Sequence, residues 1–163
     1  MTSPTESIAA DVLTRAGIPF RLHEHPPART EAELHLTGLD IDTSAKTLAF
    51  TLPDERFVLA AIPGRARLRY GNLARALGVA RAALRPMLAD ELRQLGMTPG
   101  GVTPVCADPR VVRVLDRSLL DHPVLYCGGG TPELTIEIAA ADLVRLEPTA
   151  VLADLCGDSP FPV

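Results

Sequence analysis

The sequence has no tryptophan and few other aromatic residues, with two tyrosines and four phenylalanines among 163 residues. This scarcity excludes an aromatic core, so the interior must be built from leucine, valine, isoleucine and alanine. Hydrophobic residues make up 47% of the chain, which is typical of a globular protein and not of a disordered one. A chain of this length buries about two thirds of the surface that its unfolded form exposes. We therefore expect a single domain over residues 1–163.

A cysteine framework and long hydrophobic runs are also missing. The three cysteines, Cys106, Cys127 and Cys156, are odd in number, widely spaced and outside any CxxC pattern, so neither disulfides nor a thiolate zinc site is expected. The longest apolar runs are too short to span a bilayer. The start, Met1–Pro4, lacks the basic and hydrophobic regions of a signal peptide. We expect a cytoplasmic protein with reduced thiols and no membrane contact.

The net charge of −4 argues against a protein that coats nucleic acid by bulk electrostatics. One middle segment nevertheless carries six arginines with no acid among them: Arg65, Arg67, Arg69, Arg75, Arg81 and Arg85. Such a patch could hold a few phosphates, because local neutralisation releases counterions. A solvated basic face is the alternative, and the sequence leaves both open.

Helix signals are clearest at the start of the chain. Ser3 and Glu6 form a capping box around Pro4 at the first helical position, and an apolar stripe follows as far as Gly17. Thr30 repeats the capping chemistry and opens a short helix that Gly38 can close. Further helical pieces are expected at residues 73–77, 87–96, 142–144 and 148–155.

Strand signals dominate the rest. Leu48, Phe50 and Leu52 alternate with less apolar residues, and a turn at residues 53–56 leads into the apolar run 57–62, which predicts a hairpin. Other strand-like stretches are residues 18–23, 111–115, 123–127 and 134–139. Strands joined by hairpins and long loops predict an α+β fold with a mixed, largely antiparallel sheet.

Two features suggest chemistry. Lys46 stands at the head of the hairpin, where packing can restrain its stem and aim its ammonium group; the alternative is a solvated surface lysine. Gly128–Gly130 can present backbone N–H groups to an anion or an oxyanion, or can be a plain tight turn. Pro99–Gly101 has the same two interpretations.

Other types of site find little support. His23 and His25 have no third partner at a usual ligand spacing, so no metal is expected. Cys127 has no histidine placed to activate it, which indicates a packing role. No GxSxG, P-loop or HExxH motif occurs, and no cofactor is expected.

Several motifs follow one another in an order known from one family: Lys46–Leu48, Gly96–Pro104, Val114–Asp116, Ser118–Leu120, Gly128–Gly130, Ile136–Ile138 and Asp142–Val144. In this order they resemble the YbaK-type, prolyl-tRNA-synthetase-associated editing domains, a group of free-standing aminoacyl-tRNA deacylases. The resemblance implies an α+β domain with a curled mixed sheet that holds the acceptor end of an aminoacylated tRNA. It also implies hydrolysis of the ester of a wrongly attached amino acid, commonly on proline tRNA.

The resemblance places Lys46 on the family's essential lysine. It implies substrate-binding roles for Phe20, His25, Thr47, Gly100, Gly101, Gly128, Gly129 and Gly130. The chain departs from known subgroups. Thr47 replaces the asparagine of the alanine-specific subgroup, and Cys127–Gly128 replaces its His-Pro pair; Gly128 replaces the serine usual in the cysteine-specific subgroup, and Thr131–Glu133 replaces its basic stretch. The amino acid removed, of the alanine, cysteine or serine class, therefore stays open.

The expected mechanism uses Lys46 to stabilise charge at the reacting carbonyl or the terminal phosphate, with glycine-loop amides assisting. Water or a group on the substrate would be the nucleophile. Aminoacylated tRNA is the expected partner, with the segment from Arg65 to Arg85 on its acceptor stem and an aminoacyl-tRNA synthetase as a further partner. Two alternatives remain: a non-catalytic module that binds tRNA or a synthetase, and a thiol-dependent hydrolase that uses Cys127.

Overall fold

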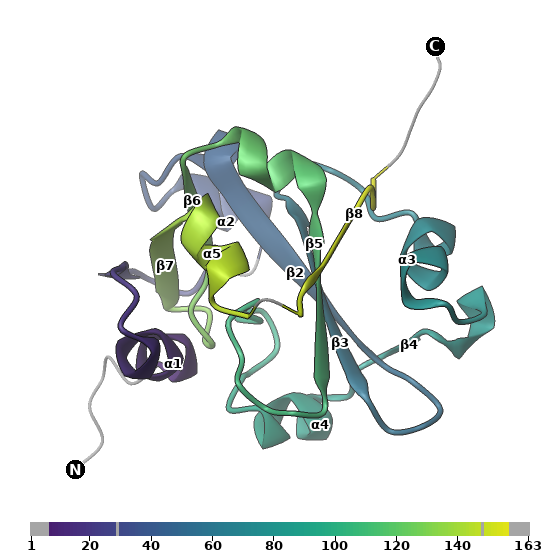
Figure 1. Cartoon of the computed structure of the whole chain (residues 1–163). Coiled ribbons are helices and arrows are strands. Elements are labelled where there is room, and N and C mark those ends of the chain that lie inside the picture. Colours follow the sequence, from purple (N-terminus) through teal and green to yellow (C-terminus); the bar gives the residue numbers. More distant parts are fainter. Residues whose placement is uncertain (1–6, 29, 148, 157–163) are drawn as a thin grey trace.

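The computed structural model describes residues 7–28, 30–147 and 149–156, which form a single-domain α+β structure around one open, mixed sheet (Figure 1). Its strands are β1 (Arg21–Glu24), β2 (Ser44–Thr51), β3 (Phe57–Pro63), β4 (Arg85–Pro86), β5 (Val111–Asp116), β6 (Val124–Gly128), β7 (Leu134–Ala139) and β8 (Val151–Ala153). The order across the sheet is β1-β7-β6-β2-β3-β5-β8, and β4 pairs with β2. Four of the seven strand pairings are antiparallel, which confirms the predicted mixed sheet.

Short helices connect these strands. They are α1 (Ile8–Ala16), α2 (Glu31–His35), α3 (Tyr70–Leu77), α4 (Ala89–Gln94) and α5 (Ala140–Arg145), with 3-10 turns η1 (Ile41–Thr43), η2 (Arg81–Ala83) and η3 (Arg117–Asp121). Ser7 caps α1 by accepting from the backbone N–H of Ala10 at 3.1 Å, and Gly17 ends the helix at a φ of +70°. The capping box expected at Ser3 lies outside the described residues. No described helix is long and apolar enough to cross a membrane.

The expectation of helical pieces at residues 148–155 is wrong. Residues 151–153 form β8, which runs parallel to β5 with Val151 opposite Val114 and Leu152 opposite Leu115. The outer edge of β5 would otherwise leave backbone groups unpaired, and β8 satisfies them. A strand of three residues is too short to show the alternating pattern that identifies strands in a sequence.

The predicted hairpin is formed by β2 and β3, and it lies at the centre of the sheet. Residues 57–62 of β3 are all buried. Val58 and Ile62 pack with Leu73 of α3 in one cluster, whereas Ala61 packs with residues of α1 and α5 in another. Because both faces of β3 are covered, its sequence is a continuous apolar run. The hairpin therefore gives its neighbours a rigid frame.

Candidate functional site

The predicted site lies where two strands separate. β2 and β6 run parallel but pair at only two positions, Ser44 with Tyr126 and Ala45 with Cys127. The next residues are Lys46 on β2 and Gly128 on β6, at the same level beyond the last pairing. The sheet thereby brings together the lysine and the glycine loop that the sequence singles out.

A pocket of about 340 Å³ lies at this fork. Its lining comes from α2 and the chain before it, from β2, from the end of β3, from the loop of residues 97–104 and from β6: Ala28, Thr30, Leu34, Ser44, Ala45, Lys46, Thr47, Gly64, Gly100, Val102 and Gly128. Sites for small ligands occupy roughly 300–1,000 Å³. This pocket is therefore large enough for a small amino acid but not for a nucleic acid.

Lys46 is exposed at this pocket. Its backbone is held opposite Ile62 of the buried strand β3. Within the described part of the chain its ammonium group makes no hydrogen bond or ion pair. The backbone of Lys46 is thus held by the sheet, and its ammonium group has no charge partner among the described residues, so the charge is available to a ligand.

Thr47 presents a second unused polar group. Its Oγ1 is buried and has no hydrogen-bond partner among the described residues. Leaving a buried hydroxyl unsatisfied costs about 1–3 kcal/mol. Thr47 lines the pocket next to Lys46, and its substrate-binding role stays a prediction.

Part of the pocket wall consists of main-chain atoms, because two glycine-containing loops approach each other closely there. A Cβ on Gly128 would lie 2.2 Å from the carbonyl oxygen of Val102, and one on Gly101 would lie 2.3 Å from backbone atoms of Thr131. The loop of residues 97–104 and the glycine loop therefore touch each other through their main chains. Any side chain at Gly128 would push the two loops apart.

The remaining predicted glycines, Gly101, Gly129 and Gly130, are not among the residues that line the pocket. The Ser7 hydroxyl donates to the carbonyl oxygen of Gly129 at 2.6 Å, and a Cβ on Gly130 would lie 3.0 Å from Ile8. Both glycines thus contact α1. Phe20 is half-buried and packs against the same hydrophobic cluster as α1. The substrate-binding roles of these residues and of Gly101 stay predictions.

His25 is fixed by local contacts. Its Nε2 lies 2.7 Å from the Thr135 hydroxyl, and its Nδ1 lies 2.8 Å from the carbonyl oxygen of Pro26. His23 places its Nε2 2.8 Å from Glu137. Neither histidine lines the pocket, and the substrate contact predicted for His25 stays a prediction.

Several lining residues carry no signal in the sequence. Thr30 is recognisable as a helix cap, and its Oγ1 indeed accepts from the N–H of Glu33 at 3.1 Å. Nothing in its pattern indicates that α2 lies over the pocket and contributes Leu34. Gly64 and Val102 come from turns whose position depends on the sheet.

Cys127 is a packing residue, as predicted. It is 2% exposed within the cluster that contains α1 and α5. Burial raises the pKa of its thiol to about 12. The thiol therefore stays protonated at neutral pH and is a poor nucleophile.

Arg113 of β5 anchors the end of the loop that carries Gly100 and Val102. It is 1% exposed, its Nε donates to the carbonyl oxygen of Pro104 at 2.7 Å, and its Nη2 donates to that of Leu143 at 3.0 Å. Burial lowers the pKa of this guanidinium. Its buried hydrogen bonds tie the loop to the sheet and to α5.

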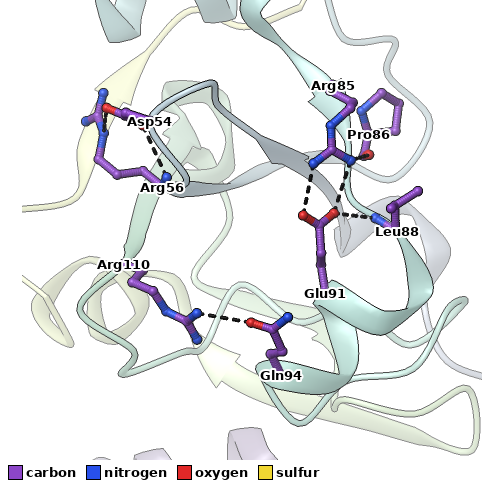
Figure 2. Close-up of polar contacts among 8 residues, drawn as sticks. All are labelled: Asp54, Arg56, Arg85, Pro86, Leu88, Glu91, Gln94 and Arg110. Atoms are coloured by element: carbon purple, nitrogen blue, oxygen red, sulfur yellow. Dashed lines mark hydrogen bonds and ion pairs between the residues drawn. The ribbon is translucent and has the colours of Figure 1, made fainter.

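Arginines at the other end of the hairpin have polar partners close by (Figure 2). Arg85 donates to both carboxylate oxygens of Glu91, at 3.1 and 2.9 Å, and the N–H of Leu88 donates to the same carboxylate at 2.8 Å. These contacts, with Arg85 as the main cause, hold the pKa of Glu91 at about 2 instead of 4.5. Arg56 pairs with Asp54 in the turn at 2.7 Å.

Arg110 completes this far end. It donates to Asp108 at 2.9 Å and to Gln94 of α4 at 3.0 Å, and its guanidinium lies 5.0 Å from the centre of the Phe57 ring. A second pocket of about 670 Å³ lies between these groups. Its arginines, Arg85 and Arg110, already have carboxylate partners, so this pocket offers no unpaired positive charge comparable to Lys46 among the residues that the structure describes.

Comparison with known proteins agrees with this geometry. The family model of the aminoacyl-tRNA editing domain matches residues 25–146. The crystal structure of the hypothetical protein APE2540 is 31% identical, with a TM-score of 0.79 over 92% of this chain and 99% of that one. A structure described as "a putative trans-editing enzyme for prolyl tRNA synthetase" is 28% identical, with a TM-score of 0.81 over 96% of this chain and 99% of that one. The chain therefore belongs to the aminoacyl-tRNA editing domain family, the YbaK-type family that its motif order predicts.

Proposed function

We propose that residues 1–163 act as one trans-editing deacylase, which hydrolyses the ester between a tRNA and a small, wrongly attached amino acid. The amino acid is of the alanine, cysteine or serine class, and the carrier is proline tRNA. The observation that carries the proposal is the unpaired Lys46 at a pocket of amino-acid size, beside the unsatisfied hydroxyl of Thr47.

Hydrolysis of this ester needs a fixed carbonyl, stabilisation of the charge that develops on its oxygen, and a nucleophile in line. Lys46 supplies the positive charge, at the carbonyl oxygen or at the terminal phosphate, and Thr47 orients the aminoacyl group. Water attacks the carbonyl carbon and loses a proton; the bond to the ribose oxygen then breaks, and that oxygen takes up a proton. The products are the free amino acid and tRNA with a free terminal hydroxyl. A side-chain hydroxyl or thiol of the substrate can replace water in the first step; the cyclic ester or thioester that forms leaves the ribose oxygen, and water then opens it to give the free amino acid.

Pocket volume sets the choice of amino acid. Ala28 and Ala45 add only methyl groups to the lining, and Gly64, Gly100 and Gly128 add none. One methylene in such a pocket changes discrimination by about 1–3 kcal/mol. We therefore expect modest selectivity among small amino acids and rejection of large ones.

The test is release of amino acid from proline tRNA charged with alanine, cysteine or serine, measured for the wild type and for Lys46→Ala. We expect Lys46→Ala to lose about 100-fold or more of the activity, the usual effect of removing one charge-stabilising donor, with an unchanged melting temperature. Arg15→Ala removes an exposed cation from α1 and serves as the control. Hydrolysis by Lys46→Ala at the wild-type rate would contradict the assignment.

A second candidate is a module that binds tRNA without hydrolysis. The pocket lining described here contains no histidine or carboxylate that could act as a general base, which favours it. This second candidate predicts that the wild-type protein binds tRNA but releases no amino acid from proline tRNA charged with alanine, cysteine or serine.

A further inference from the structure

The N-terminal helix α1 lies against the glycine loop, Gly128–Gly130, at the end of β6. Gly128 lines the pocket, and the next residue, Gly129, is in contact with Ser7, the residue directly before α1. Ser7 is 3% exposed. The contact joins residues that lie 122 positions apart in the sequence, so it is a feature of the tertiary structure that no local pattern predicts.

The Ser7 hydroxyl makes two hydrogen bonds of opposite sense. It accepts from the backbone N–H of Ala10 at 3.1 Å, which is the usual bond of a helix cap. It also donates to the carbonyl oxygen of Gly129 at 2.6 Å. A serine hydroxyl has one proton to donate, and here that proton goes to the glycine loop. The first bond therefore stabilises the helix, and the second holds the loop.

Buried side chains of α1 give this donor a fixed base. Ala9 and Leu13 are both 0% exposed and belong to the hydrophobic cluster that includes Cys127 of β6 and Ile136 of β7. The helix is thus packed on the two strands that flank the glycine loop. The hydroxyl of Ser7 therefore has a fixed position relative to that loop.

Main-chain hydrogen bonds also hold the glycine loop. The N–H of Gly129 donates to the carbonyl oxygen of Leu134 at 3.0 Å, and the carbonyl oxygen of Gly130 accepts from the N–H of Thr98 at 2.9 Å. Such main-chain bonds cannot be deleted by exchanging a side chain. The bond from Ser7 can be deleted in this way, because its donor is a side-chain hydroxyl. The contribution of Ser7 can therefore be measured separately.

Loss of the Ser7 hydroxyl would leave the Gly129 carbonyl without a hydrogen-bond partner among the described residues. Gly129 is buried, and a buried carbonyl without a partner is unfavourable. The loop would therefore shift to reach water, and Gly128 would move with it. Gly128 lies so close to Val102 that a Cβ on it would be 2.2 Å from the Val102 carbonyl oxygen. A shift at Gly129 therefore changes the pocket wall.

We infer that Ser7 is a positioning residue of the pocket, which holds the Gly129 carbonyl and thereby keeps Gly128 in place beside Lys46. The inference rests on the proposed function. Ser7 itself is not among the residues that line the pocket. A misplacement of about 1 Å can slow a reaction about 100-fold. Most of a tRNA lies outside a pocket of about 340 Å³, so we expect loss of the hydroxyl to lower kcat and to leave KM nearly unchanged.

The test variant is Ser7→Gly, because glycine caps a helix nearly as well as serine but cannot donate to Gly129. Release of amino acid is measured on proline tRNA charged with alanine, cysteine or serine. We expect Ser7→Gly to lower kcat by about 10-fold or more and to change KM by less than about 3-fold. Ser7→Thr keeps both a hydroxyl and a helix cap, so it should keep kcat within about 3-fold of the wild type.

Gly17→Ala is the matched control, because it affects the other end of α1 and leaves Ser7 unchanged. Gly17 has a φ of +70°, where a side chain is strained although nothing lies within 4 Å of the added Cβ. We expect this variant to lower Tm by about 2–4 °C and kcat by less than about 2-fold. Equal losses of kcat in Ser7→Gly and Gly17→Ala, or an unchanged kcat in Ser7→Gly, would overturn the inference and leave Ser7 as a helix cap.

Amide hydrogen exchange followed by NMR tests the same bond without a substrate. The N–H groups of Gly129 and Thr98 report on the loop, because each forms one of its main-chain hydrogen bonds. We expect both to exchange about 10-fold faster or more in Ser7→Gly than in the wild type, and less than about 3-fold faster in Gly17→Ala. Unchanged exchange in Ser7→Gly would show that the hydroxyl does not hold the loop.

Failure of this inference and failure of the proposed function are distinguishable, because hydrogen exchange needs no hydrolysis. A wild type that releases no amino acid, with faster exchange in Ser7→Gly, contradicts the deacylase and supports the hold of Ser7 on the loop. A wild type that hydrolyses charged tRNA, with unchanged exchange and kcat in Ser7→Gly, contradicts only the role of Ser7.

Discussion

The two ends of the β2–β3 hairpin carry charge in opposite ways. At the far end, Arg85 and Arg110 each have a carboxylate partner, and Figure 2 shows that of Arg85, Glu91. At the pocket end, Lys46 has no partner among the described residues, and the Thr47 hydroxyl is buried without a hydrogen bond.

The difference separates structural charge from functional charge. Partly exposed ion pairs contribute only about 0–1 kcal/mol each, so the far end fixes the turn and α4 without storing much free energy. The pocket end leaves the charge of Lys46 without a partner among the described residues, and a ligand can supply one. Similar residue types on one hairpin thus have different roles because of their partners.

The largest expected effect comes from releasing the loop that forms the pocket wall. Arg113→Met removes two buried hydrogen bonds, to Pro104 and to Leu143, and leaves two carbonyl groups unsatisfied; it also removes Nη1, which is buried without a partner among the described residues. We expect the free energy of unfolding to fall by about 2–4 kcal/mol and deacylation to fall with it, as measured by urea unfolding and by amino acid release. Arg145→Met, which breaks an exposed pair with Asp142, is the control and should cost less than about 1 kcal/mol. Equal effects of the two variants would show that Arg113 does not anchor the loop.

Gly128→Ala changes the pocket end alone. Its Cβ would lie 2.2 Å from the Val102 carbonyl oxygen, so we expect a loss of about 1–3 kcal/mol in stability together with a lower deacylation rate. Gly71→Ala is the matched control, since a Cβ there meets nothing within 4 Å in α3 and alanine is the better helix former. Thermal unfolding and hydrolysis measured on both variants decide the prediction. Full activity in Gly128→Ala would mean that the contact between the two loops does not shape the site.

Glu91→Gln tests the far end through pH. The pKa of Glu91 is lowered from 4.5 to about 2, first by Arg85 and then by the N–H of Leu88, so the carboxylate contributes stability above about pH 4.5 that is lost as pH falls toward about 2. The melting temperature of the wild type should exceed that of Glu91→Gln at neutral pH, and the gap should close over this range. Arg85→Gln should remove most of the same pH dependence. Deacylation at neutral pH should stay unchanged, and a large loss of activity would remove the distinction between the two ends.

The smallest effect is expected from Cys127→Ala. The thiol is buried with a pKa of about 12, so its removal should leave the deacylation rate within about 2-fold of the wild type. Treatment of the wild-type protein with a thiol-alkylating reagent at neutral pH should likewise spare the activity. A large loss in either experiment would restore the thiol-dependent mechanism.

The sequence predicts the features that depend on local pattern. Alternating apolar residues show the hairpin, glycines show the helix ends, and the motif order identifies the family. It does not predict β8, because three residues become a strand only through the open edge of β5. Arg113 is one polar residue inside an apolar strand, and its anchoring role depends on carbonyl groups from distant parts of the chain.

The candidate site divides in the same way. Lys46, Thr47, Gly100 and Gly128 are predicted and line the pocket. The position of α2, which supplies Leu34, is set by tertiary packing and has no local signal. Arg85 and Arg81 likewise have neighbours, Glu91 and Tyr70, that the sequence does not show to be in contact with them.

The two-residue pairing of β2 with β6 has a consequence for how such a protein can diversify. Beyond Ala45 and Cys127 no hydrogen bond of the ladder joins these strands, so the loops that close the pocket lie outside the shared framework of the sheet. Substitutions in those loops alter the shape of the cavity without breaking a strand pairing. New substrate preferences can therefore arise by small steps, while the lysine keeps the same position on an unchanged hairpin.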